Sequence, residues 1–324
     1  MSTGACNKAD YNMLNYLIMY PVETRELVNR MARICILGSG TVGTIVGRGL
    51  LKLGNQVIFY DVDERRVRKL DNFDLTATSR IESAVAQSEI SFICVPTPVM
   101  NKGMNLSYVK SVVEDLALCL RDTNEYHLVV VKSTVVPTAT EEIVIPLLEK
   151  FSGKHVGEKV GVCVNPEFLT EIYHTWTDSE RFSRGFFNED RIVVGGFDKK
   201  SGDFLETLYR PLNIPIIRTD LRTAEMIKFA CNCALASRIS YWNEIFYVCQ
   251  KLGVDSDIVA RTAAMDERIG KYGTVHGKAF GGKCLPKDLK AFLKFSERLG
   301  YEPRLLKAVE QVNEKIKADR GVRE

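Results

Sequence analysis

A short glycine-rich loop carries the residues best suited to covalent chemistry. Cys284 lies just after Gly281 and shortly before Lys287 and Asp288. Neighbouring cations favour the thiolate form of a cysteine, and the thiolate is the nucleophile. A thiolate adds to an aldehyde, a hydride can leave the adduct, and water can cleave the resulting thioester. Because a lone cysteine is more often a packing residue, this hypothesis requires partner groups elsewhere in the chain.

Two further clusters could supply those groups. Lys228 and Asn232 are four residues apart, so they share one face of a helix, where an ammonium and an amide can stabilise oxyanions. Glu167 and Glu171 are also four residues apart and follow an apolar run, and a carboxylate can act as a base toward water. Each cluster alone is typical of a solvated surface, but their combination favours catalysis.

A cofactor site is indicated by the pattern G-x-G-x-x-G, which follows an apolar run and opens a helical stretch. The glycines let the backbone approach a pyrophosphate, whose charge the helix N-terminus meets. An acid ends the next apolar run, where it can accept from ribose hydroxyls and repel a 2′-phosphate, so NAD is favoured over NADP. The expected cofactor contacts here are Gly38, Gly40, Thr41, Val42, Gly43, Asp61 and Arg66.

Hydroxyl-bearing loops follow the next two apolar runs. Pro96 and Thr97 end one, and Ser133 and Thr134 end the other. The carboxyl ends of strands are where an open α/β sheet binds its ligands. A hydroxyl in such a loop can also cap a helix, so we weigh capping and cofactor contact equally for Thr97.

The elements that must position these residues alternate between short apolar runs and helical stretches. This alternation predicts an α/β fold, a Rossmann-like, doubly wound and mostly parallel sheet. A long helix without Pro or Gly follows and suggests a spine or a dimer seam. The predicted strands are 33–37, 56–60, 90–95, 127–132, 160–164 and 191–194, and the predicted helices are 43–53, 107–120, 138–150, 199–209 and 221–252.

Length and composition fit a globular protein of two domains. The chain has 324 residues, of which 45% are hydrophobic and 26% charged. We expect an N-terminal extension at 1–30, a dinucleotide-binding domain at 31–217 and a helical domain at 218–324. A net charge of +3 gives no reason to expect a nucleic-acid or membrane partner. Nine cysteines without ligand spacing and four histidines predict no metal site and a reducing, cytoplasmic location.

At these residues the chain resembles the UDP-glucose/GDP-mannose dehydrogenase family, from about residue 31 to 313. The match rests on the glycine fingerprint and on the motifs at 95–98, 132–135, 165–169, 224–228 and 281–288, the last of which is highly specific. Within the family, Lys228 and Asn232 look most like UDP-glucose 6-dehydrogenase. The family's C-terminal nucleotide-binding domain is expected to be absent.

The resemblance implies oxidation of the C6 alcohol of a nucleotide sugar to a carboxylate, with two NAD⁺ consumed. It implies that Cys284 is the nucleophile and that Lys228 and Asn232 contact the oxyanions and the substrate. Thr134 and Asp288 would position water, and Glu167 would be the acid and base of thioester hydrolysis. The remaining implied contacts are Glu171 and Lys287 for the cofactor, and Phe168, Leu169, Arg268 and Gly281 for the substrate.

Three alternatives stay open at the level of sequence. The substrate could instead be UDP-N-acetylmannosamine or GDP-mannose, and the chain could be a catalytically incomplete, NAD-binding dimer. The resemblance also implies a homodimer through the long helix. Two departures from the family pattern bear on the site: Thr138 replaces a glycine after the Ser-Thr-Val loop, and about eight extra residues lie near Trp176, Phe186 and Phe187.

Overall fold

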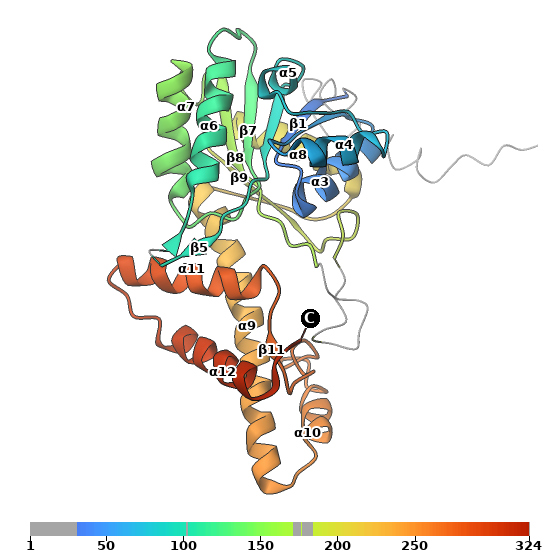
Figure 1. The fold of residues 1–324 in the computed structure, drawn as a ribbon, viewed down its shortest axis with the longest axis vertical. Coiled ribbons are helices and arrows are strands. Elements are labelled where there is room, and N and C mark those ends of the chain that lie inside the picture. Colours follow the sequence, from blue (N-terminus) through green and yellow to red (C-terminus); the bar gives the residue numbers. More distant parts are fainter. Residues whose placement is uncertain (1–30, 102, 171–175, 177–183, 324) are drawn as a thin grey trace, which may run out of the picture.

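A computed structural model describes residues 31–101, 103–170, 176 and 184–323 of the chain. An eight-stranded sheet forms its upper part, in the order β10-β9-β8-β7-β4-β1-β2-β3 (Figure 1). All neighbouring strands are parallel except β8 and β9. The strands are β1 (Arg33–Leu37), β2 (Gln56–Tyr60), β3 (Ala77–Thr78), β4 (Ile90–Ile93), β7 (His127–Val131), β8 (Val160–Val164), β9 (Ile192–Gly196) and β10 (Ile216–Thr219).

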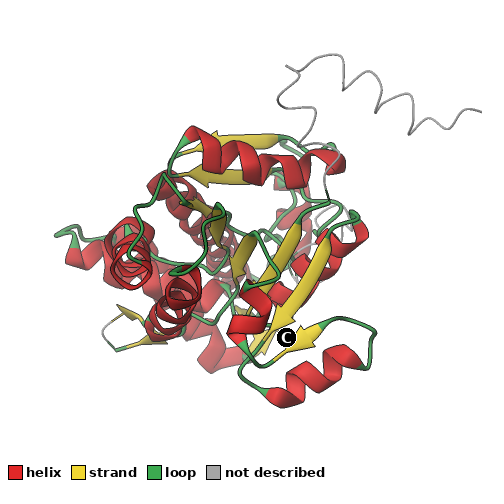
Figure 2. Cartoon of the chain, turned by 90° about the horizontal axis from the view of Figure 1, so that it is seen from above, coloured by secondary structure: helices red, strands yellow, loops and turns green. Residues whose placement is uncertain are grey.

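Helices cover both faces of this sheet (Figure 2). Alternate residues of β1 point to opposite faces, so Ile34 and Ile36 join one hydrophobic core while Cys35 and Leu37 join the other. The elements of this part are α3 (Thr41–Lys52), α4 (Glu64–Asp71), α5 (Ile81–Val85), α6 (Ser107–Leu120), a π-helix (Thr140–Val144), α7 (Ile145–Ser152), α8 (Lys199–Tyr209) and a 3-10 turn (Arg210–Leu212). The predicted fold class, a Rossmann-like and mostly parallel sheet, is confirmed.

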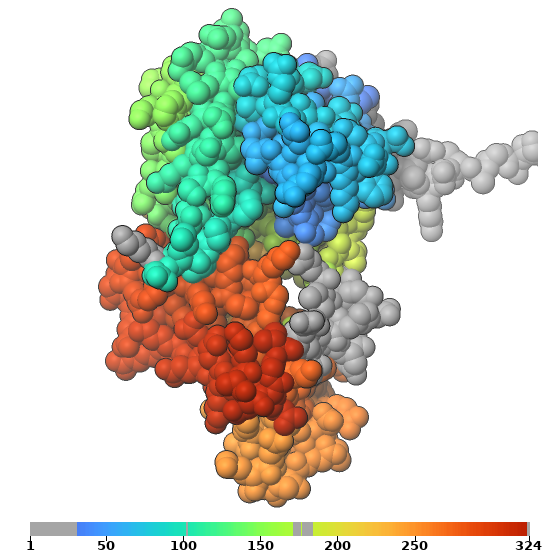
Figure 3. All heavy atoms as spheres, viewed as in Figure 1, coloured from blue at the N-terminus to red at the C-terminus, as the bar shows by residue number. Residues whose placement is uncertain are grey.

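The second part of the fold is helical. Helix α9 (Leu221–Leu252) has the predicted bounds, since its interior lacks Pro and Gly and its ends are capped by Asp220 and by Gly253 in the left-handed conformation. It is packed by α11 and α12, and α11 also contacts the hairpin of β5 and β6 (Figure 3). The further elements are α10 (Ser256–Ala263), α11 (Leu285–Arg298), α12 (Arg304–Arg320), β5 (Val99–Met100), β6 (Gly103–Met104), β11 (Ala279–Phe280) and β12 (Val322–Arg323).

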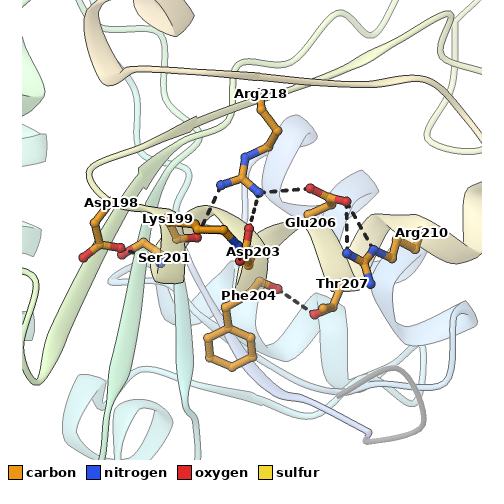
Figure 4. A network of polar contacts seen from close by, with 9 residues as sticks. All are labelled: Asp198, Lys199, Ser201, Asp203, Phe204, Glu206, Thr207, Arg210 and Arg218. Atoms are coloured by element: carbon orange, nitrogen blue, oxygen red, sulfur yellow. Dashed lines mark hydrogen bonds and ion pairs between the residues drawn. The ribbon is translucent and has the colours of Figure 1, made fainter. Parts of the chain in front are cut away.

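An ion-pair network fixes the end of the sheet from which α9 departs (Figure 4). Arg218 of β10 donates to Asp203 at 2.9 Å and to Glu206 at 3.0 Å, both on α8. The guanidinium lies against Gly202, where an added Cβ would sit 1.9 Å from a guanidinium nitrogen. Because β10 ends one residue before the cap of α9, this network sets the direction in which the long helix leaves the sheet.

Four predicted elements have an end that differs by two residues in the structure. The helix expected at 43–53 spans Thr41–Lys52, because it begins directly after the N-cap Gly40, and the strand expected at 90–95 ends at Ile93. The helix expected at 138–150 begins at Thr140 and opens with a π-helical turn, because Thr138 has a φ of +76° that no right-handed helix allows. The strand expected at 191–194 runs from Ile192 to Gly196. Within the described residues, no helix combines the length and the apolar character needed to cross a membrane.

The described part of the extra segment is anchored to the sheet layer. Phe186 is 6% exposed and packs with Leu50 and Tyr209. Its ring lies so close to Gly49 that an added Cβ would sit 2.3 Å away. The adjacent Phe187 is 50% exposed. Its ring meets the edge of the Phe186 ring and lies 5.9 Å from the ammonium of Lys52.

This difference predicts unequal effects of two neighbouring substitutions. Phe186→Ala leaves a cavity beside α3 and should lower the free energy of unfolding by about 3–5 kcal/mol. Phe187→Ala removes an exposed ring and should change it by less than about 1 kcal/mol. Urea unfolding of the two variants checks the prediction, and equal losses would contradict the packing described.

Candidate active site

The glycine loop between β1 and α3 is in backbone contact with the loop after β4. Gly38 has a φ of +101°, and a Cβ there would sit 2.8 Å from the carbonyl oxygen of Cys94. A Cβ on Gly43 would sit 2.0 Å from the carbonyl oxygen of Gly38. Both positions therefore exclude a side chain. The strand order reverses between β1 and β4, the point at which such sheets bind dinucleotides.

The start of α3 offers an open anion site. Its N-cap is Gly40, no side chain caps the helix, and the nearest atom to a Cβ added at Gly40 is 3.6 Å away. The first N–H groups of a helix have no partner within the helix, so they can bind a pyrophosphate. Thr41 is exposed and Val42 half-buried at this end. The loop fits NAD as the sequence predicts.

Asp61 lies at the end of β2 beside the same loop. Its carboxylate is buried, accepts the N–H of Ser39 at 2.8 Å and pairs with Arg66 at 3.5 Å. The carboxylate therefore stands where a ribose would meet it, and Arg66 neutralises part of its charge. This arrangement agrees with the preference for NAD over NADP, since a second phosphate would face the carboxylate.

Hydroxyl groups tie the strand-end loops to one another. The hydroxyl of Thr97 donates to the carbonyl oxygen of Thr134 at 2.7 Å, and that of Ser133 donates to the carbonyl oxygen of Val95 at 2.7 Å. Thr97 therefore caps no helix, so of the two roles predicted for its hydroxyl, helix capping is wrong. Pro96, which lies between Val95 and Thr97, is exposed.

A buried ion pair joins α9 to the loop after β8. The ammonium of Lys228 lies 3.0 Å from the carboxylate of Glu167 and 2.5 Å from its carbonyl oxygen. The second carboxylate oxygen accepts the N–H of Leu169 at 2.8 Å. Burial opposes both charges, but the pairing outweighs it: the pKa of Glu167 is lowered and that of Lys228 is raised. Both groups are therefore charged at neutral pH.

The cysteine loop meets the same helix one turn further along. The amide of Asn232 donates to the carboxylate of Asp288 at 2.5 Å, and Lys287 lies 3.1 Å from the other carboxylate oxygen. The N–H of Asp288 bonds to the carbonyl oxygen of Cys284, the N-cap residue of α11. Lys287 also reaches the hydroxyl of Thr97 at 3.4 Å. The structure thus brings together clusters that the sequence could only place separately.

Cys284 is exposed, but its thiol does not have the expected character. Packing around the sulfur raises its pKa, Glu167 and Asp288 act in the same direction, and Lys228 and Lys287 act against them. The expectation of a thiolate held by neighbouring cations is wrong for this structure, because burial of the sulfur and the carboxylates of Glu167 and Asp288 outweigh the two lysines. The resting form at neutral pH is the neutral thiol.

A buried polar group that the sequence motifs did not single out lies beneath the Glu167 loop. The ammonium of Lys132 donates to the amide oxygen of Asn165 at 2.8 Å, and the hydroxyl of Tyr209 donates to the same oxygen at 2.6 Å. Burial lowers the pKa of Lys132, and the carboxylate of Glu167 counteracts this. The signal was present in the sequence, since Lys132 and Asn165 each directly follow a strand buried on both faces.

The expected substrate residues lie in different surroundings. The ring of Phe168 lies between the guanidinium of Arg191, 4.3 Å from its centre, and Lys228, 5.5 Å from it. Leu169 and Gly281 are half-buried. The side chain of Arg268 is exposed and binds Asp266 of its own turn at 2.6 Å, away from the buried pairs. Glu171 lies outside the described residues.

The described residues contain no group of three or more His, Cys, Asp or Glu side chains arranged to hold a metal ion. The polar groups gathered here are instead a thiol, two ammonium groups, an amide and two carboxylates. Those groups can bind and cleave a carbonyl derivative without a metal, with a dinucleotide held at the neighbouring glycine loop.

Comparisons with known proteins agree with this geometry. The model of the NAD-binding domain of the UDP-glucose/GDP-mannose dehydrogenase family matches residues 70–213, and that of its central domain matches residues 222–315. GDP-mannose 6-dehydrogenase of Pseudomonas syringae pv. tomato is 34% identical over 306 residues, which are 87% of this chain and 68% of that protein. UDP-glucose 6-dehydrogenase AglM of Haloferax volcanii is 35% identical over 87% of this chain and 69% of its own.

Solved structures give the same relationship. The structure of a UDP-glucose dehydrogenase from the hyperthermophilic archaeon Pyrobaculum islandicum superposes with a TM-score of 0.80 at 35% identity, covering 88% of this chain and 68% of that one. Fold and site therefore define an NAD-dependent oxidoreductase of the nucleotide-sugar dehydrogenase class. The chain belongs to the UDP-glucose/GDP-mannose dehydrogenase family, as its motifs predict.

The charge balance around Cys284 predicts how its thiol titrates. Alkylation by iodoacetamide, followed at the Cys284 peptide by mass spectrometry, should increase with pH and reach its midpoint above 9.0, the ordinary thiol pKa. Glu167→Gln removes the charge that raises this pKa most after burial, so the midpoint should fall. Asp266→Asn, an exposed carboxylate paired with Arg268, serves as the control. A wild-type midpoint below 8 would contradict the charge balance.

Proposed function

We propose that the protein oxidises the C6 alcohol of UDP-glucose to the carboxylate of UDP-glucuronate. The observation that supports this most is the convergence of two buried pairs, Lys228 with Glu167 and Asn232 with Asp288, on the loop of Cys284. Bound at the glycine loop, NAD⁺ supplies the hydride acceptor for both oxidations. The chain's own residues then orient the sugar, hold the reacting carbon and control its protons.

The first oxidation removes a hydride from C6 and a proton from its hydroxyl, which passes to water, and it leaves an aldehyde. The S–H bond of Cys284 then adds across the C=O bond, so that sulfur bonds to C6 and the proton goes to oxygen. Lys228 and Asn232 face this oxygen and stabilise the charge that develops on it.

The second oxidation removes the remaining hydride from C6, which a second NAD⁺ would accept, and the proton of the hydroxyl, which passes to water. The thiohemiacetal thereby becomes a thioester. Water held by Thr134 and Asp288 attacks the carbonyl carbon, the carbon–sulfur bond breaks, and the thiol recovers a proton. Glu167 serves as acid and base for this hydrolysis, since its carboxylate is charged and next to Lys228. Lys287 links Thr97 to Asp288 and thereby connects the cofactor loop to the water site.

The choice of UDP-glucose as the substrate is supported by fewer residues than the reaction itself. Relatives of similar identity bear the names GDP-mannose 6-dehydrogenase and UDP-glucose 6-dehydrogenase. We favour UDP-glucose because the α9 residues from Lys228 to Asn232 resemble that branch of the family. The sugar would lie against Phe168, Leu169 and Gly281, whereas Arg268 would need a different rotamer or a second copy of the chain to reach it.

The outer face of α9 supports a homodimer as the working form. Tyr241, Val248 and Leu252 are all exposed on this helix. Large apolar side chains repeated along one exposed helix are typical of a subunit interface. We propose that two copies pair along this face, which sedimentation of the purified chain can test.

The central prediction is formation of NADH from NAD⁺ and UDP-glucose. Cys284→Ser should abolish the formation of UDP-glucuronate, because a hydroxyl is a far weaker nucleophile than a thiol. Cys119→Ser, a half-buried cysteine of α6, is the matched control and should keep the wild-type rate. Binding of NAD in calorimetry without turnover on any nucleotide sugar would contradict the proposal and favour an NAD-binding protein without activity.

A substrate panel tests the choice of sugar. We expect kcat/KM for UDP-glucose to exceed those for GDP-mannose and UDP-N-acetylmannosamine by about tenfold or more, since a site built to hydrogen-bond one sugar leaves polar groups unpaired with another. The relative values of kcat/KM, measured on one preparation by NADH absorbance, show which sugar is preferred. A preference for GDP-mannose would keep the chemistry and replace the substrate.

A further inference from the structure

The backbone is strained at Thr138, four residues after Thr134. Thr138 has a φ of +76°, in the left-handed region that a β-branched residue rarely adopts. This conformation is unfavourable for an L-residue, because the Cβ comes too close to the following carbonyl oxygen. Such a conformation persists only where the surrounding structure holds it.

The group that holds it is a carboxylate from another helix. One oxygen of Glu225 accepts the N–H of Thr138 at 2.7 Å, and the other accepts the N–H of Thr140 at 2.9 Å. Thr140 begins the π-helix, whose own N-cap, Ala139, provides no side-chain acceptor. The first N–H groups of a helix need acceptors, and its N-terminus favours a negative charge. Glu225 therefore caps a helix to which it does not belong.

The position of Glu225 connects two parts of the site. It is 2% exposed and lies on α9 three residues before Lys228, so the two side chains share one face of that helix. The loop that it caps carries Thr134, whose carbonyl oxygen receives the hydroxyl of Thr97. One carboxylate thus fixes the Thr134 loop to the helix that presents Lys228.

The Glu225 carboxyl is ionised in mildly alkaline solution. Its pKa is raised to about 7, because burial and the charge of Glu141 raise it more than the hydrogen bonds from Thr140 and Thr138 lower it. The charged side chains facing this region are Glu141 and Glu142 of the π-helix and Arg222 of α9, and Arg222 is paired with Glu141. Experiments at pH 8 therefore probe the ionised form of Glu225, whose carboxylate accepts both N–H groups.

We infer that Glu225 is a positioning residue, which holds residues 138–140 in their strained conformation and so sets the place of Thr134 opposite Lys228. The effect on turnover rests on the proposed function, but the effect on the loop does not. Glu225→Gln keeps the shape and replaces one acceptor by an NH₂ donor, which faces an N–H and leaves it unpaired.

Amide hydrogen exchange of residues 135–141 at pH 8 tests the capping directly. In Glu225→Gln this segment should exchange at least about tenfold faster, because one buried N–H loses its acceptor, while α8 should keep its wild-type rate. Glu142→Gln, an exposed carboxylate on the same π-helix, is the matched control. Unchanged exchange of the segment in Glu225→Gln would overturn the inference even if the protein has no nucleotide-sugar activity.

Turnover tests the positioning. Glu225→Gln should lower kcat about tenfold and leave the KM for NAD within about twofold, because the glycine loop is untouched. Thr138→Gly in the Glu225→Gln background should recover part of kcat, since glycine adopts positive φ without strain. If Glu225→Gln does not fold, Glu225→Asp takes its place. Loss of kcat and of NAD affinity together, with no recovery by Thr138→Gly, would assign Glu225 a merely structural role and overturn the inference.

Discussion

The contact on which the site depends is the buried pair of Lys228 and Glu167. Removing two charges from water is costly, and it is offset only when both groups find close partners. Here Lys228 meets both the carboxylate and the carbonyl oxygen of Glu167, and Glu167 also accepts a backbone N–H. The pair joins the long helix to a strand end of the sheet, so the two halves of the fold cannot shift independently without exposing an unpaired charge.

Around this pair the loops form a continuous polar network. Thr97 bonds to the Thr134 loop, Lys287 reaches Thr97, and Asp288 receives both Lys287 and Asn232. Each positive charge thereby has a nearby negative one, so the lysines do not offset the burial that raises the pKa of the Cys284 thiol. The positive and negative charges of the site are therefore balanced. A reaction of the Cys284 sulfur with a substrate carbonyl would change this charge balance.

Departures from the family pattern are accommodated by specific neighbours. Thr138, in a position where the family has glycine, keeps a positive φ because Glu225 binds its N–H. Phe186, in the extra segment, finds room because Gly49 has no side chain. In each case one residue elsewhere in the chain accommodates the departure.

The sequence by itself determined the fold class, the cofactor loop and the long helix, because each follows from local rules. Apolar periodicity marks strands and helices, glycines mark the turn between β1 and α3, and the lack of Pro and Gly marks α9. It also identified the family, since the motif around Cys284 is specific. These features depend on residues that are neighbours along the chain.

Only the tertiary structure decided which of those residues meet. Lys228 and Glu167 are 61 residues apart, and Asn232 and Asp288 are 56 apart, so no local pattern reports their contacts. The direction of the thiol pKa shift was predicted wrongly for the same reason. The lysines beside Cys284 are visible in the sequence, but the burial of its sulfur and the carboxylate of Glu167, which together raise the pKa, arise only in the fold. Charge balance is a sum over neighbours in space, and only the fold supplies those neighbours.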